Sequence, residues 1–180
     1  LALFEFDSQY GSYPDNTTAQ TVKDNTGSQL TSSGSSANDM FRQLFAAGIC
    51  EQEEIFYAKT SYTKKPDNVK NTAANCLAAG ENGFGYLMNG QTGLSSSGDP
   101  ARPIAITPLM NATTDGTCDL DPFDKRAVVL RADQSAVQLN IRPTDKQVVV
   151  PGGRTLLQTG QDTVWGTDVQ PQIMPPQRKN

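Results

Sequence analysis

The sequence predicts an α+β domain in which an N-terminal α-helix packs on an antiparallel β-sheet of about four strands. Two observations carry this prediction. Apolar residues repeat with helical spacing between Leu1 and Pro14, and they alternate as in half-buried strands between Arg126 and Ile141. The chain has 180 residues, enough for one domain with a normal core, and its hydrophobic content of 36% indicates that long polar loops dilute this core.

The first element is a short helix with a broad apolar face. Gly11 and Pro14 end it, because glycine favours helix C-termini and proline cannot continue the helix. Helices shorter than about 12–15 residues are marginal alone in water. We therefore expect this helix to be clamped on a partner surface or to be the end of a longer helical spine, and we favour the spine. The residues of its apolar face are Leu1, Leu3, Phe4, Phe6 and Tyr10.

Residues 15–80 are predicted to be a variable region of polar loops and short helices. Ser36 and Asp39 have the spacing of a capping box, which indicates a second helix closed by Gly48. Its apolar stripe consists of Met40, Phe41, Leu44 and Phe45.

Three shorter elements are expected in the same region. Asn16 or Thr17 is predicted to cap one helical turn, residues 54–59 to form an extended strand, and Asp67 to cap a small helix through Leu77.

Residues 83–150 are predicted to form the sheet. Residues 84–88 and 103–110 have strand character, and Pro108 favours an edge position or a bulge. Residues 126–141 are predicted to form a hairpin with one apolar face, which needs a helix to cover it, and residues 147–150 an edge strand.

The predicted domain thus spans residues 1–150, with the helix end at 1–11. A tail follows at residues 151–180. Trp165, the only tryptophan of the chain, lies in this tail and is expected to anchor it on the domain.

Composition excludes several classes of function. The net charge of −4 argues against a nucleic-acid partner, which favours a basic surface. The absence of histidine excludes Ser-His-Asp and Cys-His catalysis and histidine-ligated zinc. No apolar run is long enough for a membrane span; if the spine hypothesis holds, the span lies upstream of Leu1.

Cys50, Cys76 and Cys118 lack the CxxC spacing of redox and zinc motifs. For an exported protein we predict a disulfide between Cys50 and Cys76, which would contribute roughly 3 kcal/mol. Three buried thiols in a reduced protein are the alternative.

One acidic loop is a candidate calcium site, because calcium prefers oxygen ligands. The spacing and terminal glutamate of an EF-hand are absent, so we favour a solvated turn and no cofactor. A hydrolase that pairs Glu53 and Glu54 with an aspartate of this loop has no support from spacing. The four candidate ligands are Asp115, Asp119, Asp121 and Asp124.

Several motifs resemble type IV pilin-like proteins (pseudopilins). Residues 126–141 are similar to the last hairpin of this family, and residues 35–49 and 80–90 resemble a subgroup of large bacterial pseudopilin-like proteins. The N-terminal motif looks like the region after the membrane-spanning half of the first helix in this family; its matching residues are Ala2, Leu3, Phe6, Tyr10, Gly11, Tyr13 and Pro14.

The resemblance implies a structural subunit without catalytic activity, in a type IV pilus-like or type II secretion pseudopilus-like filament. It implies an inner-membrane anchor upstream, a location in the bacterial cell envelope, and other copies or related subunits as partners. Leu1, Leu3, Phe4 and Phe6 would then serve assembly. The alternative is a secreted or cell-surface binding module or adhesin.

Overall fold

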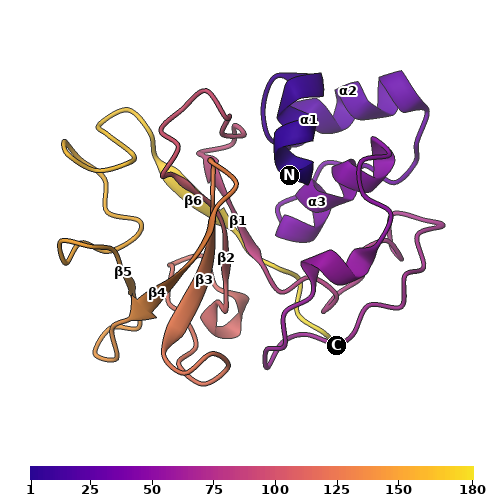
Figure 1. The fold of residues 1–180 in the computed structure, drawn as a ribbon. Helices are drawn as coiled ribbons and strands as arrows, with labels where there is room; N and C mark the ends of the chain where they lie inside the picture. Colours follow the sequence, from indigo (N-terminus) through magenta and orange to yellow (C-terminus); the bar gives the residue numbers. More distant parts are fainter.

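The computed structural model describes residues 1–180. Six strands form one curled antiparallel sheet in the order β5-β4-β3-β2-β1-β6. Figure 1 shows this sheet between the helices on one side and the loops that flank β5 on the other. The helices are α1 (Ala2–Tyr10), α2 (Asn16–Thr26) and α3 (Ala37–Ala46), with 3₁₀ turns η1 (Glu53–Phe56) and η2 (Met110–Ala112). The strands are β1 (Gly85–Asn89), β2 (Pro103–Thr107), β3 (Arg126–Arg131), β4 (Ala136–Ile141), β5 (Val148–Val149) and β6 (Pro171–Met174).

The predicted helical spine on a four-stranded sheet is wrong. α1 has nine residues and ends at Gly11, which adopts a left-handed conformation (φ 84°). The central helix is α3 instead, with nine of its ten residues buried. Phe41 of α3 meets Tyr86 of β1 edge to face, with ring centroids 5.4 Å apart, and also packs on Phe56. The helix that contacts the sheet most closely is therefore the one with the more continuous apolar stripe.

α3 begins as predicted, at a capping box. The Ser36 hydroxyl accepts a hydrogen bond from the Asp39 N–H at 3.1 Å, and the Asp39 carboxylate accepts one from the Ser36 N–H at 3.1 Å. α2 is longer than the single predicted turn because Asp15, one residue before the expected caps, accepts hydrogen bonds from the N–H groups of Thr17 and Thr18.

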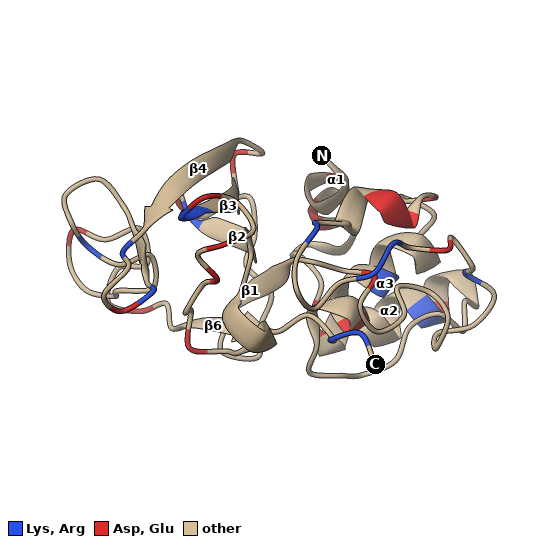
Figure 2. Ribbon diagram, turned by 90° about the horizontal axis from the view of Figure 1, so that it is seen from below, with Lys and Arg blue, Asp and Glu red and all other residues tan.

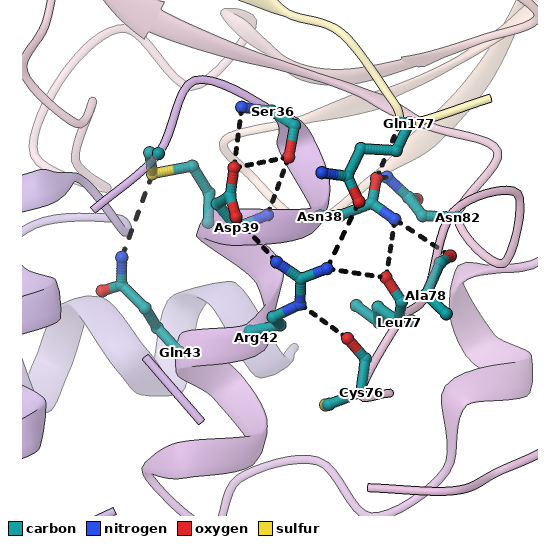
Figure 3. Close-up of polar contacts among 12 residues, drawn as sticks. Ser36, Asn38, Asp39, Arg42, Gln43, Cys76, Leu77, Ala78, Asn82 and Gln177 are labelled. Carbon is teal, nitrogen blue, oxygen red and sulfur yellow. Dashed lines mark hydrogen bonds and ion pairs between the residues drawn. The ribbon is translucent and has the colours of Figure 1, made fainter. Parts of the chain in front are cut away.

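A buried polar network attaches α3 to the segment before β1 (Figure 3). The Arg42 guanidinium donates to the carbonyls of Cys76 at 2.6 Å and Leu77 at 3.1 Å, and pairs with Asp39 at 2.6 Å. Asn38 donates to the Leu77 carbonyl at 2.8 Å and accepts from the Gln177 N–H at 2.9 Å. The network thus fixes three distant parts of the chain around the first turns of α3.

Two expected elements between residues 50 and 80 are absent. The predicted strand at 54–59 is instead η1 followed by irregular chain, and no helix runs from Asp67 to Leu77. The Asp67 carboxylate accepts from the Val69 N–H at 2.9 Å, a local turn that competes with a helix, and Leu77 has a positive φ of 45°.

The hairpin of β3 and β4 is confirmed, but no helix covers its apolar face. Val129 and Leu139 line a cavity together with Leu156 and Val164 from the C-terminal segment. Trp165 is fully buried in the hydrophobic core with Val129 and Ile141, and its indole N–H donates to the Leu156 carbonyl of the same C-terminal segment at 2.8 Å. The C-terminal segment therefore covers the face that we assigned to a helix.

The sheet gains a strand that the sequence did not suggest. β6 pairs with β1 at one edge, where Pro171 is tolerated as its first residue. β5 forms the other edge, as predicted. β2 lies between β1 and β3, so the expected edge position near Pro108 is wrong; Pro108 lies just beyond the end of the strand.

Charged residues are distributed over both the helical side and the sheet side of the molecule (Figure 2). Besides Arg42–Asp39, the ion pairs are Lys64–Glu81 at 3.8 Å and the exposed pair Arg142–Asp145 at 2.6 Å. The side-chain hydrogen bond from Arg142 is the largest cause that lowers the pKa of Asp145 to about 2.

Candidate functional site

The main hollow on the helical side of the molecule is an apolar groove of about 500 Å³ beside α1. Fifteen residues line it, twelve of them hydrophobic. They come from the start of α1, one side of α3, the segment Ile49–Phe56, Phe84 just before β1, and the sheet residues Ala105 and Leu130. Elements distant in sequence therefore combine into one wall.

Exposed apolar side chains lie at and near this groove. Leu1 and Ile55, which line it, are 82% and 60% exposed. Phe4, on α1, is 40% exposed, and the remaining large exposed apolar residue is Val69. Contiguous exposed apolar surface indicates an interaction site, whereas single exposed residues are normal.

α1 and the chain just after it are hydrogen-bonded to the loop between β1 and β2. The Asp7 carboxylate accepts hydrogen bonds from the N–H group of Ser96, at 2.9 Å, and from its hydroxyl. The Tyr13 N–H donates to the Leu94 carbonyl at 2.8 Å. These contacts hold the C-terminal half of α1 and the chain just after it, whereas Leu1 and Phe4 at its start remain exposed.

The groove has few groups that could perform chemistry. Its acidic residues are Glu5 and Glu51. The pKa of the Cys50 thiol is raised to about 11, mainly by burial and to a lesser extent by the negative charge of Glu5. This thiol is therefore a poor nucleophile near neutral pH. The groove is suited to receive apolar side chains.

The residues predicted for assembly divide into two groups. Leu3 and Phe6 are buried, Tyr10 is half-buried, and Leu1 and Phe4 are exposed. The rings of Phe6 and Tyr10 stack with centroids 4.6 Å apart. Phe6 and Tyr10 thus hold α1 in place, while Leu1 and Phe4 are available to a partner.

All three cysteines are buried free thiols. The nearest charged groups of Cys50 are Glu5 and the N-terminus, whereas those of Cys76 include Glu53 and Arg42. The two predicted partners thus lie in different surroundings, and their disulfide stays a prediction.

The four aspartates of the acidic loop do not form a group of converging carboxylates. Asp115 accepts hydrogen bonds from the hydroxyls of Thr113 and Thr117 and from the Thr117 N–H. Asp119 accepts from the Asp121 N–H at 3.2 Å. These are bonds within local turns, and a set of three close carboxylates occurs elsewhere, at Glu53, Asp67 and Glu81.

Little in the sequence indicated the groove. Ile55 and Phe56 were assigned to a strand, and only the 3₁₀ turn places them beside Leu1. Glu53 is buried while its neighbour Glu54 is exposed, so the pair that we considered for hydrolysis does not face a common site.

No helix in the structure combines the length and apolar character needed to cross a membrane. Comparison of the chain with protein-family models, with curated proteins and with solved structures gave no match.

Proposed function

We propose that this chain is a structural subunit of a filament of the type IV pilus or type II secretion pseudopilus kind, without catalytic activity. The observation that carries the proposal is the open apolar groove next to the exposed apolar side of α1. The resemblance of the short motifs supports it. The architecture adds nothing, because the expected arrangement of helix and sheet was wrong.

The occupant that we propose for the groove is a second copy of this chain. The surface combines an apolar recess with an apolar projection, Phe4, that does not line the recess. A contact in which Phe4 of one copy enters the groove of the next uses two different surfaces. Such head-to-tail contacts continue into open filaments when the rotation does not close a ring.

The proposed location follows from this role. The subunit would belong to the bacterial cell envelope, held in the inner membrane by a helix upstream of Leu1 before assembly and carried to the periplasm or cell surface afterwards. Its partners would be further copies or related subunits.

The test replaces Ile55 with serine in the bacterium that carries the gene. Ile55 is 60% exposed in the groove, and small surface changes alter stability by about 0.5 kcal/mol or less, so Ile55→Ser should leave the fold intact. Because the substitution makes the groove more polar, it should reduce the number of filaments at least about tenfold. Immunogold electron microscopy of surface fractions measures the effect.

The matched control is Val69→Ser, because Val69 is 40% exposed and lies outside the groove. It should assemble like the unmodified protein. Filaments that lack this protein, or undiminished assembly of Ile55→Ser, would contradict the proposal.

A second candidate function is a secreted or cell-surface binding module. A cavity of about 220 Å³ on the other face of the sheet favours it, because Arg131, Arg154 and Asp162 place polar groups beside the apolar wall of β3 and β4. Small-molecule sites combine such features. Release of the protein as a soluble monomer, with no filament in the same cells, would support this alternative.

A further inference from the structure

Three carboxylates from separate segments converge near η1. Glu53 is the first residue of η1, Asp67 lies in the loop that follows, and Glu81 precedes β1. One carboxylate oxygen of each lies within 4.8 Å of the others. Glu53 and Glu81 are fully buried, whereas Asp67 is exposed, so the group is open to solvent on one side.

The buried carboxylates are incompletely satisfied. One oxygen of Glu53 accepts from the Leu77 N–H at 2.6 Å, but the other, Oε2, is buried without any hydrogen-bond partner. Buried polar atoms are almost always paired, so an orphaned oxygen on a carboxylate that converges with two others calls for a ligand.

The positive charge nearby is small. Lys64 Nζ lies 3.8 Å from Glu81 Oε1, and the lysine side chain is 51% exposed. The Lys70 ammonium is held by Asn68, at 2.7 Å from its side-chain oxygen. One half-exposed ammonium does not balance three carboxylates, two of which are buried.

Backbone groups hold the carboxylates in this arrangement. Glu81 accepts from the Ala78 N–H at 2.8 Å and from the Asp67 N–H at 3.4 Å. The Leu77 N–H that binds Glu53 belongs to the segment that Arg42 and Asn38 fix to α3. The group is therefore built on the rigid centre of the domain.

We propose that Glu53, Asp67 and Glu81 bind a calcium ion. All three offer hard oxygen ligands, neither histidine nor cysteine belongs to the group, and the exposed side leaves room for the waters that complete the coordination of calcium. The ion would join η1, the loop around Asp67 and the turn before β1, a region in which the structure has no α-helix or strand. This site does not depend on the proposed filament function.

The experiment measures thermal unfolding and calorimetric binding of the chain after treatment with EDTA. Calcium at a hundredfold excess over its dissociation constant should raise Tm by about 5–10 °C. Magnesium, which demands stricter octahedral geometry, should raise it much less. An unchanged Tm with no binding heat, or an equal effect of magnesium, would overturn the proposal.

Two variants locate the site. Glu53→Gln should abolish the calcium-dependent shift in Tm, and Asp67→Asn, which changes an exposed residue and should fold normally, should weaken calcium binding at least about tenfold. The matched control is Asp115→Asn, which changes an aspartate of the acidic loop and should retain the full shift.

Retention of the full shift in both Glu53→Gln and Asp67→Asn, or its loss in Asp115→Asn, would contradict the assignment. A protonated Glu53 is the competing account of its orphaned oxygen. That account predicts no calcium effect on the unmodified chain and a Glu53→Gln variant as stable as the unmodified chain.

Discussion

α1 and α3 have similar lengths and similar apolar content, yet they have different roles. α3 is buried along nearly its whole length, begins at a satisfied capping box, and is bound through Arg42 to the segment before β1. α1 has no side-chain cap and buries only Leu3, Phe6 and Asp7. α3 therefore contributes mainly to the stability of the fold, whereas α1 leaves apolar side chains exposed on the surface.

The first prediction compares one phenylalanine in each helix. Phe41→Ala should lower the free energy of unfolding by about 3–5 kcal/mol, because it leaves a cavity between α3, β1 and η1. Phe4→Ala should change it by less than about 0.5 kcal/mol, because Phe4 is largely on the surface. Urea unfolding measures both; equal losses would remove the distinction between the two helices.

The second prediction concerns the thiols near the two helices. Cys50, in the groove, has a pKa of about 11, whereas burial, followed by the charge of Glu53, raises that of Cys76 to about 12. The thiolate fraction of Cys50 should be the higher of the two, so iodoacetamide should label Cys50 before Cys76 at pH 9. Mass spectrometry of labelled peptides measures the order, and faster labelling of Cys76 would show that the groove is closed.

The same pKa values predict the effect of alkaline pH. In the unfolded chain the thiols ionise near their ordinary pKa of 9.0, but the folded protein keeps them protonated to about 11 and 12. The free energy of unfolding should therefore fall as the pH rises above about 9.

The sequence predicted best what depends on neighbouring residues. The capping box of Ser36 and Asp39 and the alternation in residues 126–141 are local patterns, and both elements form as expected. Of the predicted apolar face of the first helix, Leu3 and Phe6 are buried but Leu1 and Phe4 are exposed, because a stripe does not say how much of its surface the rest of the chain covers.

The largest errors concern contacts between distant segments. β6 pairs with β1 although some eighty residues separate them. The C-terminal segment covers the face of the β3–β4 hairpin that we expected a helix to cover. The carboxylates of Glu53, Asp67 and Glu81 converge from three irregular segments, without any motif spacing. Periodicity carries no information about such tertiary pairings.

The most direct test of the proposed assembly surface is sedimentation of two variants, separately and mixed. Phe4→Ser removes the projection and Ile55→Ser alters the groove, so each alone should remain monomeric at concentrations where the unmodified chain associates. A one-to-one mixture should form dimers and nothing larger, because it retains one intact projection and one intact groove. Unmodified chain that stays monomeric, or variants that associate as it does, would contradict the account.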